Sequence, residues 1–281
     1  MFDIVIIGAG VIGLAIAKAI GNNSNKSVLV IEKEETFGRG ISSRNSEVIH
    51  SGIYYEPNSL KAKYCTEGRE LLYDYCKENH VWVNPCGKII VGSGHQENDL
   101  ENLFKNGKMN SVDDLKIIDK KEINRLESNI DADIGLYIGC TGILSAHELM
   151  IAYYRESQLK NHDYLFKSKL VGAKQINSGY ELDIENPLGE IETVSCEWVI
   201  NSAGLESDII AELIGEDFPK LKYSKGCYFK LSPKWRSAFN RLISVPIPFF
   251  SVSSALVLVF LTAGFTFCKV FCDFSSVSVC F

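Results

Sequence analysis

The sequence predicts an α/β fold, in which a buried parallel sheet carries helices and a second, mixed sheet is inserted into the chain. Residues 2–7 form a near-continuous apolar run, typical of a parallel strand buried on both faces. The glycine-rich turn GAGVIG follows at residues 8–13, and an apolar helical segment occupies residues 14–20. Residues 27–32 repeat the strand pattern and end in an acid. This order of strand, glycine turn, helix and strand predicts a Rossmann-like domain.

The glycine-rich opening suits the phosphates and ribose of an adenine dinucleotide. Gly8 permits the tight turn out of the strand, Gly10 lets the backbone approach a pyrophosphate, and Gly13 allows close packing of helix on strand. The helix N-terminus offers N–H groups and the positive end of its dipole to the phosphates. Glu32 is expected to accept hydrogen bonds from the adenosine ribose. A glycine turn in an unrelated α/β protein is the alternative, which the complete strand–helix–strand context disfavours.

A polar stretch at residues 42–55, SSRNSEVIHSGIYY, indicates that the dinucleotide carries a flavin. Ser42 and Ser43 can donate hydroxyls to a phosphate, and Arg44 can add positive charge. A glycine two residues beyond His50 permits close approach of the backbone to a flat ligand such as an isoalloxazine ring. For His50 alone, a hydrogen-bonded structural imidazole is an equally good interpretation.

Together with the segment NSLKAKYC at residues 58–65, these motifs resemble the L-2-hydroxyglutarate dehydrogenase/oxidase family of the FAD-dependent D-amino-acid-oxidase-like superfamily. Supporting matches are EGRELLY at 67–73, CGKIIV at 86–91, TGI at 141–143, NSAGL at 201–205 and KGCYF at 225–229. The resemblance covers residues 2–245 and implies FAD as the cofactor. It also implies a Rossmann-like FAD-binding domain with an inserted mixed-sheet substrate domain.

The chemistry that the resemblance implies is oxidation of an L-2-hydroxy acid to the 2-oxo acid, with hydride transfer to flavin N5. A base takes the hydroxyl proton, and His50 is the candidate catalytic residue within the matching motif. Tyr54, Tyr55 and Lys61 are candidates for placing a dicarboxylate, although each is as easily structural. His147 is a weaker candidate, because it ends a segment, SAH, whose first position is more often acidic in the family.

Several functional alternatives stay open at this point. The chain fits an amino-acid or glycerol-3-phosphate oxidoreductase of the same superfamily, or an inactive membrane-attached flavin-binding fragment. The small 2-hydroxy acid is the expected substrate. Oxygen, a quinone and an electron-transfer flavoprotein are all open as the electron acceptor.

The remaining elements are expected to alternate between two domains. Helices are predicted over 59–78, 97–106, 120–126, 146–159 and 206–214, strands over 87–91 and 198–204, and an antiparallel meander over 164–174, 180–185 and 191–193. The meander brings Val171 toward the adenine, and Ala203 and Gly204 are expected beneath the dinucleotide. The expected bounds are 1–85 with 146–218 for the FAD-binding domain, and 86–145 with 219–245 for an incomplete substrate domain.

Residues 246–281 form an apolar tail that the resemblance does not cover. Leu242 to Cys268 contains no charged residue, whereas the rest of the chain is rich in charge. A membrane helix over 249–268 has a suitable length, but Ser, Val and Phe are poor helix formers. A frameshifted end or an unusual core segment would also account for the tail, and of the three the frameshift is favoured. The resemblance implies further substrate-domain strands after Val245, and the tail does not match them. We therefore expect weak FAD binding and little activity.

Composition limits the remaining function classes. The net charge of −6 and the pI of about 5.5 argue against a nucleic-acid-binding protein. None of the nine cysteines forms a CxxC pair, and we expect no metal site. Six of them are expected as reduced thiols that serve as small core residues: Cys65, Cys76, Cys86, Cys140, Cys196 and Cys227. Met1 leads directly into a strand, so a cytoplasmic location is expected, with membrane association only through the tail.

Overall fold

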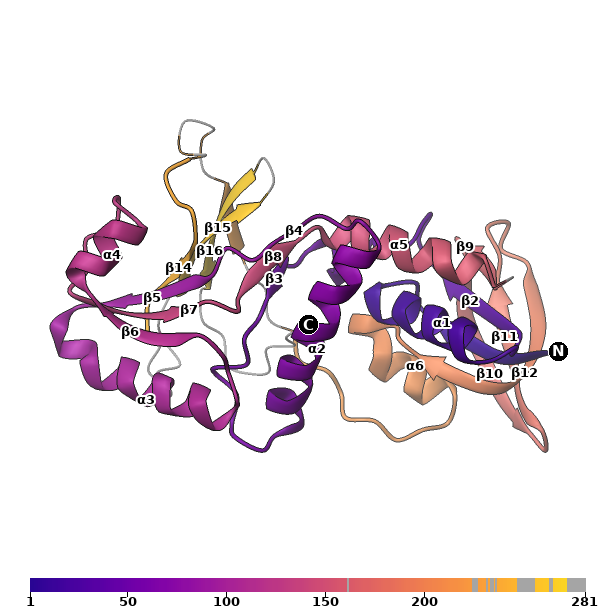
Figure 1. Cartoon of the computed structure of the whole chain (residues 1–281). Coiled ribbons are helices and arrows are strands. Elements are labelled where there is room, and N and C mark those ends of the chain that lie inside the picture. The colour runs from indigo at the N-terminus through magenta and orange to yellow at the C-terminus, as the bar shows by residue number, and fades with distance from the viewer. Residues whose placement is uncertain are drawn as a thin grey trace. The chain divides into compact units, whose positions relative to one another are not determined.

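A computed structural model of the chain describes residues 1–160, 162–223, 227–230, 232, 235, 237–246, 256–262 and 265–271. The chain divides into two units (Figure 1). The first unit comprises Met1–Asn45 and Ala146–Tyr223, and the second comprises Ser46–Ser145 and Ser224–Phe281. This division assigns residues 46–85 to the second unit, whereas the sequence places them in the FAD-binding domain. The expected domain bounds therefore stay a prediction.

The first unit is built on a six-stranded sheet with the order β10-β11-β12-β1-β2-β9. Its strands are β1 (Phe2–Ile7), β2 (Val28–Glu32), β9 (Asp163–Phe166), β10 (Lys169–Ile176), β11 (Gly179–Glu185) and β12 (Ile191–Asn201). β1 pairs in parallel with β2 and β12, β2 pairs in parallel with β9, and β10, β11 and β12 form an antiparallel meander. The helices are α1 (Val11–Asn23), α5 (Ala146–Gln158), α6 (Ser207–Leu213) and the 3₁₀ helices η1 (Ile41–Ser43) and η3 (Gly204–Glu206).

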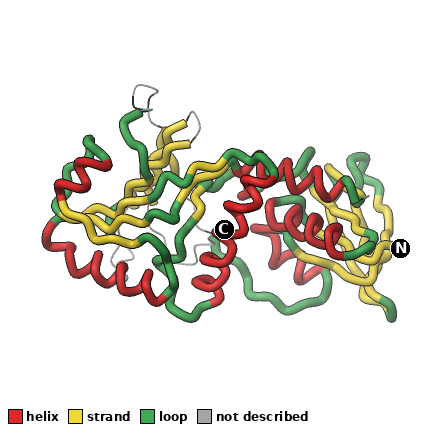
Figure 2. The backbone as a smooth tube through the Cα atoms, in the orientation of Figure 1, coloured by secondary structure: helices red, strands yellow, loops and turns green. Residues whose placement is uncertain are grey.

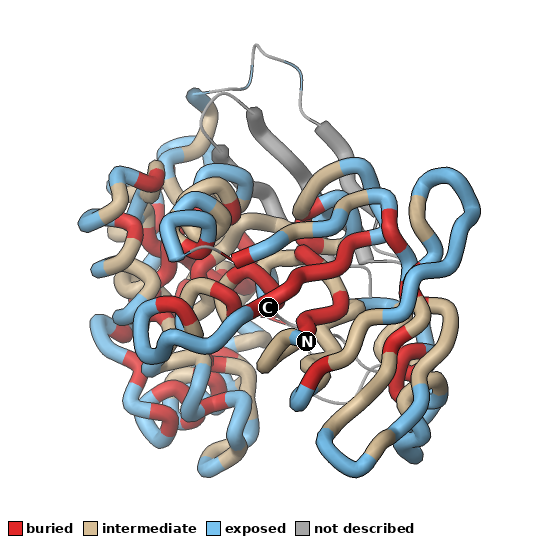
Figure 3. The backbone as a smooth tube through the Cα atoms, turned by 90° about the vertical axis from the view of Figure 1, so that its right-hand side faces the viewer, coloured by how far each residue is buried: buried red, intermediate tan, exposed pale blue. Residues whose placement is uncertain are grey.

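Side chains at alternate positions of β1 enter two separate apolar cores, one on each face of the sheet. Val5 and Ile7 pack with Ile210 of α6. Ile6 packs with Leu14 of α1 and with Met150 of α5. Figure 3 shows buried positions along the strands and exposed positions in many of the loops. Because both faces of the strand are covered, its sequence is apolar at successive positions, not only at alternate ones.

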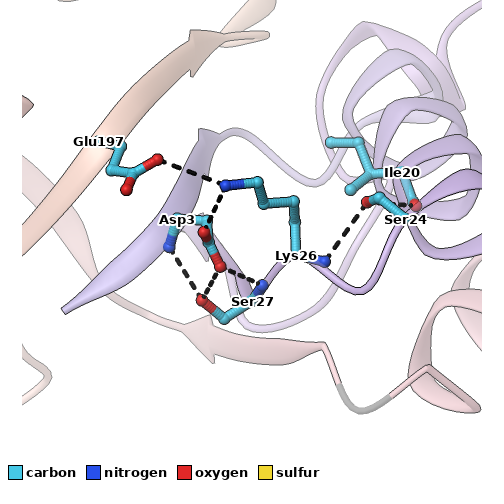
Figure 4. Close-up of polar contacts among 6 residues, drawn as sticks. All are labelled: Asp3, Ile20, Ser24, Lys26, Ser27 and Glu197. Carbon is cyan, nitrogen blue, oxygen red and sulfur yellow. Dashed lines mark hydrogen bonds and ion pairs between the residues drawn. The ribbon is translucent and has the colours of Figure 1, made fainter.

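A polar cluster ties the beginnings of β1 and β2 together (Figure 4). Asp3 Oδ2 accepts hydrogen bonds from both N and Oγ of Ser27, at 2.7 Å each. Lys26 Nζ lies 2.7 Å from Asp3 Oδ1 and 3.4 Å from Glu197 Oε2 of β12. The Lys26 ammonium and the Ser27 hydrogen bonds hold the pKa of Asp3 well below its usual value. The cluster therefore joins three strands at the end of β1 that is opposite the glycine turn.

The second unit contains a mixed sheet with the order β13-β16-β15-β14-β5-β7-β6. Figure 2 draws the strands in yellow. Its strands are β5 (Lys88–Gly92), β6 (Leu115–Asp119), β7 (Ile134–Ile138), β13 (Cys227–Lys230), β14 (Leu242–Ser244), β15 (Leu256–Thr262) and β16 (Phe265–Phe271). β14 and β5 are parallel, and the other neighbours are antiparallel. A smaller sheet consists of β3 (Val48–Ile49), β8 (Gly142–Leu144) and β4 (Val83–Asn84). The helices are α2 (Leu60–Glu78), α3 (Glu97–Met109), α4 (Lys120–Leu126) and the 3₁₀ helix η2 (Gly94–Gln96).

The mixed sheet also separates two apolar cores. Ile90 of β5 and Ile138 of β7 pack with Leu103 of α3. Ile89, the neighbour of Ile90 along the strand, packs with Ile123 of α4 in a different core. The alternation of side chains along β5 therefore assigns α3 and α4 to opposite faces.

Three of the predicted strands are wrong in their extent. Residues 164–174 were expected as one strand, but β9 ends at Phe166 and Lys167 has φ +54°. This turn sends β9 to the edge of β2 and leaves β10 to begin the meander. Conversely, the segment predicted at 191–193 and residues 198–201 of the segment predicted at 198–204 belong to the single strand β12, which ends at Asn201. The first half of β12 pairs with β11, and its second half pairs with β1.

The apolar tail forms strands where the structure describes it. β15 and β16 occupy most of the segment 249–268 that was considered as a membrane helix, so these residues are not helical. Residues 249–255 and 263–264 of that segment lie outside the described residues. Within the described part of the chain, no helix is both long enough and apolar enough to cross a bilayer.

Candidate functional site

The turn between β1 and α1 has no room for a side chain at two of its glycines. Gly8 has φ +102°, and a Cβ there would lie 2.6 Å from the carbonyl oxygen of Ser202. A Cβ on Gly13 would lie 2.0 Å from the carbonyl oxygen of Gly8 and 2.7 Å from Ser202 Oγ. Only glycine therefore lets β1, α1 and the chain beyond β12 meet at backbone distance.

The N-terminus of α1 faces a buried hydroxyl. Val11 N donates to Ser42 Oγ at 3.0 Å, and a Cβ on Gly10 would lie 3.0 Å from the same oxygen. The first turn of α1 contains no acidic residue, so no side chain of that turn competes with an anion for the positive end of the helix dipole. The Ser42 hydroxyl keeps its own proton to donate, which suits a phosphate oxygen.

Glu32 closes the other side of the turn from the end of β2. Its Oε2 accepts from Ala9 N at 2.8 Å, and its Oε1 accepts from Glu34 N at 3.0 Å. The residue is 9% exposed. Each carboxylate oxygen accepts more than one hydrogen bond, so two bonds leave acceptor capacity for hydroxyl groups. The carboxylate thus fixes the turn, and its binding of a ribose stays a prediction.

Ser43 and Arg44 are exposed, and their hydrogen bonds remain within their own loop. Ser43 Oγ donates to the carbonyl oxygens of Gly40 and Arg39, at 3.0 and 3.1 Å. Arg44 Nη1 donates to the Ser43 carbonyl oxygen at 3.3 Å. Of the three residues predicted to contact phosphate here, Ser42 is the one whose hydroxyl accepts from the helix N-terminus.

The chain beyond β12 packs against the same turn. Ser202 Oγ donates to the carbonyl oxygens of Ile7 and Gly8, at 2.9 Å each. Ala203 is the N-cap of η3, and Gly204 has φ +61°. Both predicted residues therefore lie at the carboxyl end of a parallel strand adjacent to β1, the edge where such sheets bind ligands.

Val171 lies elsewhere in the first unit, at a β-bulge. The pairing of β10 with β11 shifts between Leu170 and Gly172, which leaves Val171 as the extra residue. Its predicted contact with an adenine stays a prediction. The structure does bring the three glycines, Ser42 and Glu32 together around the N-terminus of α1.

His50 belongs to the second unit and follows the short strand β3. This strand pairs with β8, which fixes Val48 opposite Ile143 and Ile49 opposite Gly142. The carbonyl oxygen of His50 accepts a hydrogen bond from Cys65 Sγ of α2 at 3.4 Å. The backbone on both sides of His50 is thereby attached to neighbouring elements.

The loop that follows His50 is held by three buried side chains that sequence reasoning missed. Arg69 of α2 donates to one loop carbonyl, and the amides of Asn106 and Asn110 donate to three more, at distances of 2.7–3.2 Å. The accepting residues are Ser51, Gly52, Ile53 and Tyr55. The i, i+4 spacing of the two asparagines was an available signal, but Asn110 lies beyond the helix predicted over 97–106.

The weaker candidates lie in different surroundings. Tyr54 Oη accepts a hydrogen bond from Lys88 Nζ at 3.1 Å. Tyr55 N donates to the Gly52 carbonyl oxygen at 3.2 Å. Lys61 is exposed on α2. His147 is exposed at the beginning of α5, and its ring stacks on Phe37 with 6.5 Å between the centroids.

The described thiols are buried or half-buried. Cys65, Cys76, Cys86, Cys140 and Cys196 form no disulfide. Burial raises the pKa of Cys86 and of Cys140, and it raises the pKa of Cys196 to about 11. A thiol that stays protonated is a poor nucleophile and a poor metal ligand. Within the described residues, no group of three or more His, Cys, Asp or Glu side chains could hold a metal ion.

Comparison with known proteins gives one family for almost the whole chain. The family described as FAD dependent oxidoreductase matches residues 3–269. This match runs past Val245, where the resemblance was expected to end. A solved structure, the dithionite-reduced L-α-glycerophosphate oxidase of Mycoplasma pneumoniae with FAD bound, is similar with a TM-score of 0.85 and 22% identity. It covers 96% of this chain and 71% of that one, and its likeness confirms the predicted fold class.

Two curated relatives are similar at higher identity. The mitochondrial L-2-hydroxyglutarate dehydrogenase of Arabidopsis thaliana is 36% identical, over 88% of this chain and 57% of the relative. The mitochondrial L-2-hydroxyglutarate dehydrogenase of Homo sapiens is 34% identical, over 83% of this chain and 52% of the relative. The chain thus spans little more than half the length of these relatives.

Proposed function

The chain belongs to the FAD-dependent oxidoreductase family, and from this premise we propose that it oxidises an L-2-hydroxy acid to the 2-oxo acid. L-2-hydroxyglutarate is the proposed substrate, because the curated relatives named above carry that activity in their names. FAD is the cofactor of the family. The observation that carries cofactor binding is the turn at Gly8 and Gly13, where a side chain of any size would collide with backbone.

The fit of the residues to FAD supports this proposal. A dinucleotide needs close backbone approach at its pyrophosphate, an N-terminal helix end for the phosphates and an acid for the ribose. Gly10 and Ser42 border the N-terminus of α1, and Glu32 lies at the end of β2. We assign the phosphates to the helix end and the ribose to Glu32.

The reaction needs a hydride acceptor and a base. FAD, when bound, would supply the acceptor for the hydride of the substrate α-carbon. An imidazole nitrogen of His50 is proposed to take the hydroxyl proton, a role that contributes about 10²–10⁴-fold to a rate. The attachment of this loop at Cys65, Arg69 and Asn110 supports the proposal, because a general base must be held in place.

Absorbance spectroscopy tests cofactor and substrate in sequence. The purified chain, reconstituted with FAD, should show flavin absorbance bands after removal of free flavin. Anaerobic L-2-hydroxyglutarate should bleach these bands, whereas glycine and glycerol-3-phosphate should not. Bleaching by glycerol-3-phosphate or an amino acid would instead assign another oxidation, and flavin without bleaching would indicate a binding protein that does not oxidise any of these compounds.

The electron acceptor and location follow from further measurements. Reoxidation of the bleached flavin by air, by a soluble quinone or by an electron-transfer flavoprotein distinguishes the three acceptors. We propose a reducing compartment such as the cytoplasm, supported by the five cysteines among the described side chains that form no disulfide. Fractionation of cells that express the tagged chain tests this, and membrane association is the contrary result.

A further inference from the structure

Lys88 is a buried lysine on an apolar face of the mixed sheet. It begins β5 and is only 7% exposed. Its partners across the sheet are Ile138 of β7 and Leu242 of β14, which are 0% and 1% exposed. Among the residues whose side chains the structure describes, no carboxylate forms an ion pair with Lys88. A buried ammonium normally has such a partner, because removing its charge from water is costly.

Tyr54 is the side chain that Lys88 contacts. Lys88 Nζ donates to Tyr54 Oη at 3.1 Å and lies 4.8 Å from the centroid of the tyrosine ring. An ammonium has three donors, and a phenol that accepts one hydrogen bond keeps its own proton to donate. The pair therefore offers two N–H groups and one O–H group at nearly one point.

The loop that carries Tyr54 is fixed before any ligand arrives. Asn106 donates to the carbonyl oxygens of Ile53 and Tyr55, on either side of Tyr54. Asn110 donates to Tyr55 and Gly52, and its own Oδ1 is buried without a hydrogen-bond partner among the described residues. An orphaned acceptor destabilises the fold, so its presence indicates that the position of this loop matters.

We propose that Lys88 and Tyr54 bind a carboxylate group of the substrate and so select an acidic substrate. The inference rests on the proposed function for the identity of that substrate, but not for the site itself. A carboxylate would neutralise the buried ammonium and accept from both partners, which makes charge-assisted hydrogen bonds. Because His50 lies four residues before Tyr54, the same loop would carry both the base and part of the carboxylate site.

Calorimetric titration with glutarate, an unreactive dicarboxylate, tests the site without turnover. In the FAD-loaded chain, Lys88→Met should raise the Kd for glutarate by about 10–100-fold, as expected for loss of a charge-assisted hydrogen bond. Tyr54→Phe should raise it less, and Lys88→Arg should restore most of the affinity. Lys105→Met removes an exposed lysine of α3 as the matched control and should leave the Kd unchanged.

Thermal unfolding separates this role from a structural one. If Lys88 serves a ligand, Lys88→Met removes an unpaired buried charge and should leave the apparent melting temperature equal or higher. A lower melting temperature with unchanged glutarate affinity would overturn the proposal, and so would a wild-type chain that does not bind glutarate. If Lys88→Met does not fold, Tyr54→Phe with unchanged affinity contradicts the site. Failure of L-2-hydroxyglutarate to bleach the flavin would contradict the proposed function alone.

Discussion

Two glycines within helices show how one residue type serves opposite purposes. A Cβ on Gly13 of α1 would lie 2.0 Å from the carbonyl oxygen of Gly8. A Cβ on Gly68 of α2 would have none of the described atoms within 4 Å. The first glycine is required by packing, whereas the second only weakens its helix.

Alanine at these positions should therefore change stability in opposite directions. Gly13→Ala should lower the free energy of unfolding by about 1–3 kcal/mol, because the turn must move to admit a methyl group. Gly68→Ala should raise it by about 0.8–1.0 kcal/mol through helix propensity alone. Urea unfolding followed by circular dichroism measures both, and equal effects would contradict the packing of the turn.

Single residues also mark what could be predicted from the sequence. The positions of Gly8, Gly13 and Glu32 follow from local spacing, because a strand, a turn and a helix determine them within one segment. Lys88 and Asn106 acquire their roles from partners 34 and 53 residues away. No local sequence pattern indicates a contact between residues so far apart in the chain. The burial of Lys88 and Asn106 beside the Tyr54 loop could therefore not be predicted.

At the scale of elements, α3 and its C-cap hold the His50 loop through Asn106 and Asn110. Asn106→Ala leaves the carbonyl oxygens of Ile53 and Tyr55 without this donor, so we expect a loss of about 1–3 kcal/mol in the free energy of unfolding. Asn98→Ala, an exposed position on the same helix, should stay within about 0.5 kcal/mol. Chemical denaturation of the two variants compares them directly, and similar losses would contradict a specific role of Asn106 in holding the loop.

The polar cluster at the beginning of β1 predicts a dependence on pH. Lys26 and Ser27 lower the pKa of Asp3 in the folded chain, so this carboxylate stabilises the fold above its unfolded pKa of about 3.9. The contribution is lost as pH falls from there toward the lower folded pKa. Wild type should exceed Asp3→Asn in urea midpoint at pH 7, and the difference should shrink below about pH 4. A difference that stays constant down to pH 3 is the contrary result.

Elements were predicted best where their boundaries are encoded locally. Ser59 accepts from Ala62 N as the N-cap of α2, and the predicted helix begins there. The strand predicted over 164–174 is wrong because Lys167 has a positive φ and ends the first part of it. No glycine at this position indicates the turn in the sequence. β16 pairs with β13, whose residues lie far earlier in the chain. Periodicity within the apolar tail gives no information on such pairing, so a helix and a strand were both compatible with it.

At the scale of the whole molecule, the proposed cofactor binding would couple the separate parts of the first unit. Its residues come from Met1–Asn45 and from Ala146–Tyr223, which meet at the turn where Ser202 contacts Gly8. The second unit interrupts these two segments in sequence. A ligand held at this turn binds the folded chain and not the unfolded chain, and it therefore stabilises both segments by mass action.

FAD should accordingly raise the melting temperature of the chain, whereas FMN, which lacks the adenosine half, should not. At a concentration 100 times its Kd, FAD should add about 2.7 kcal/mol to the free energy of unfolding. Hydrogen exchange should slow at residues 8–13 and at 202–204, the two segments that border the turn. The same protection in Gly13→Ala, or an equal effect of FMN, would place the cofactor somewhere other than the N-terminus of α1. Protection confined to 8–13 would mean that the chain beyond β12 takes no part in binding, since both segments meet at backbone distance only when the turn is intact.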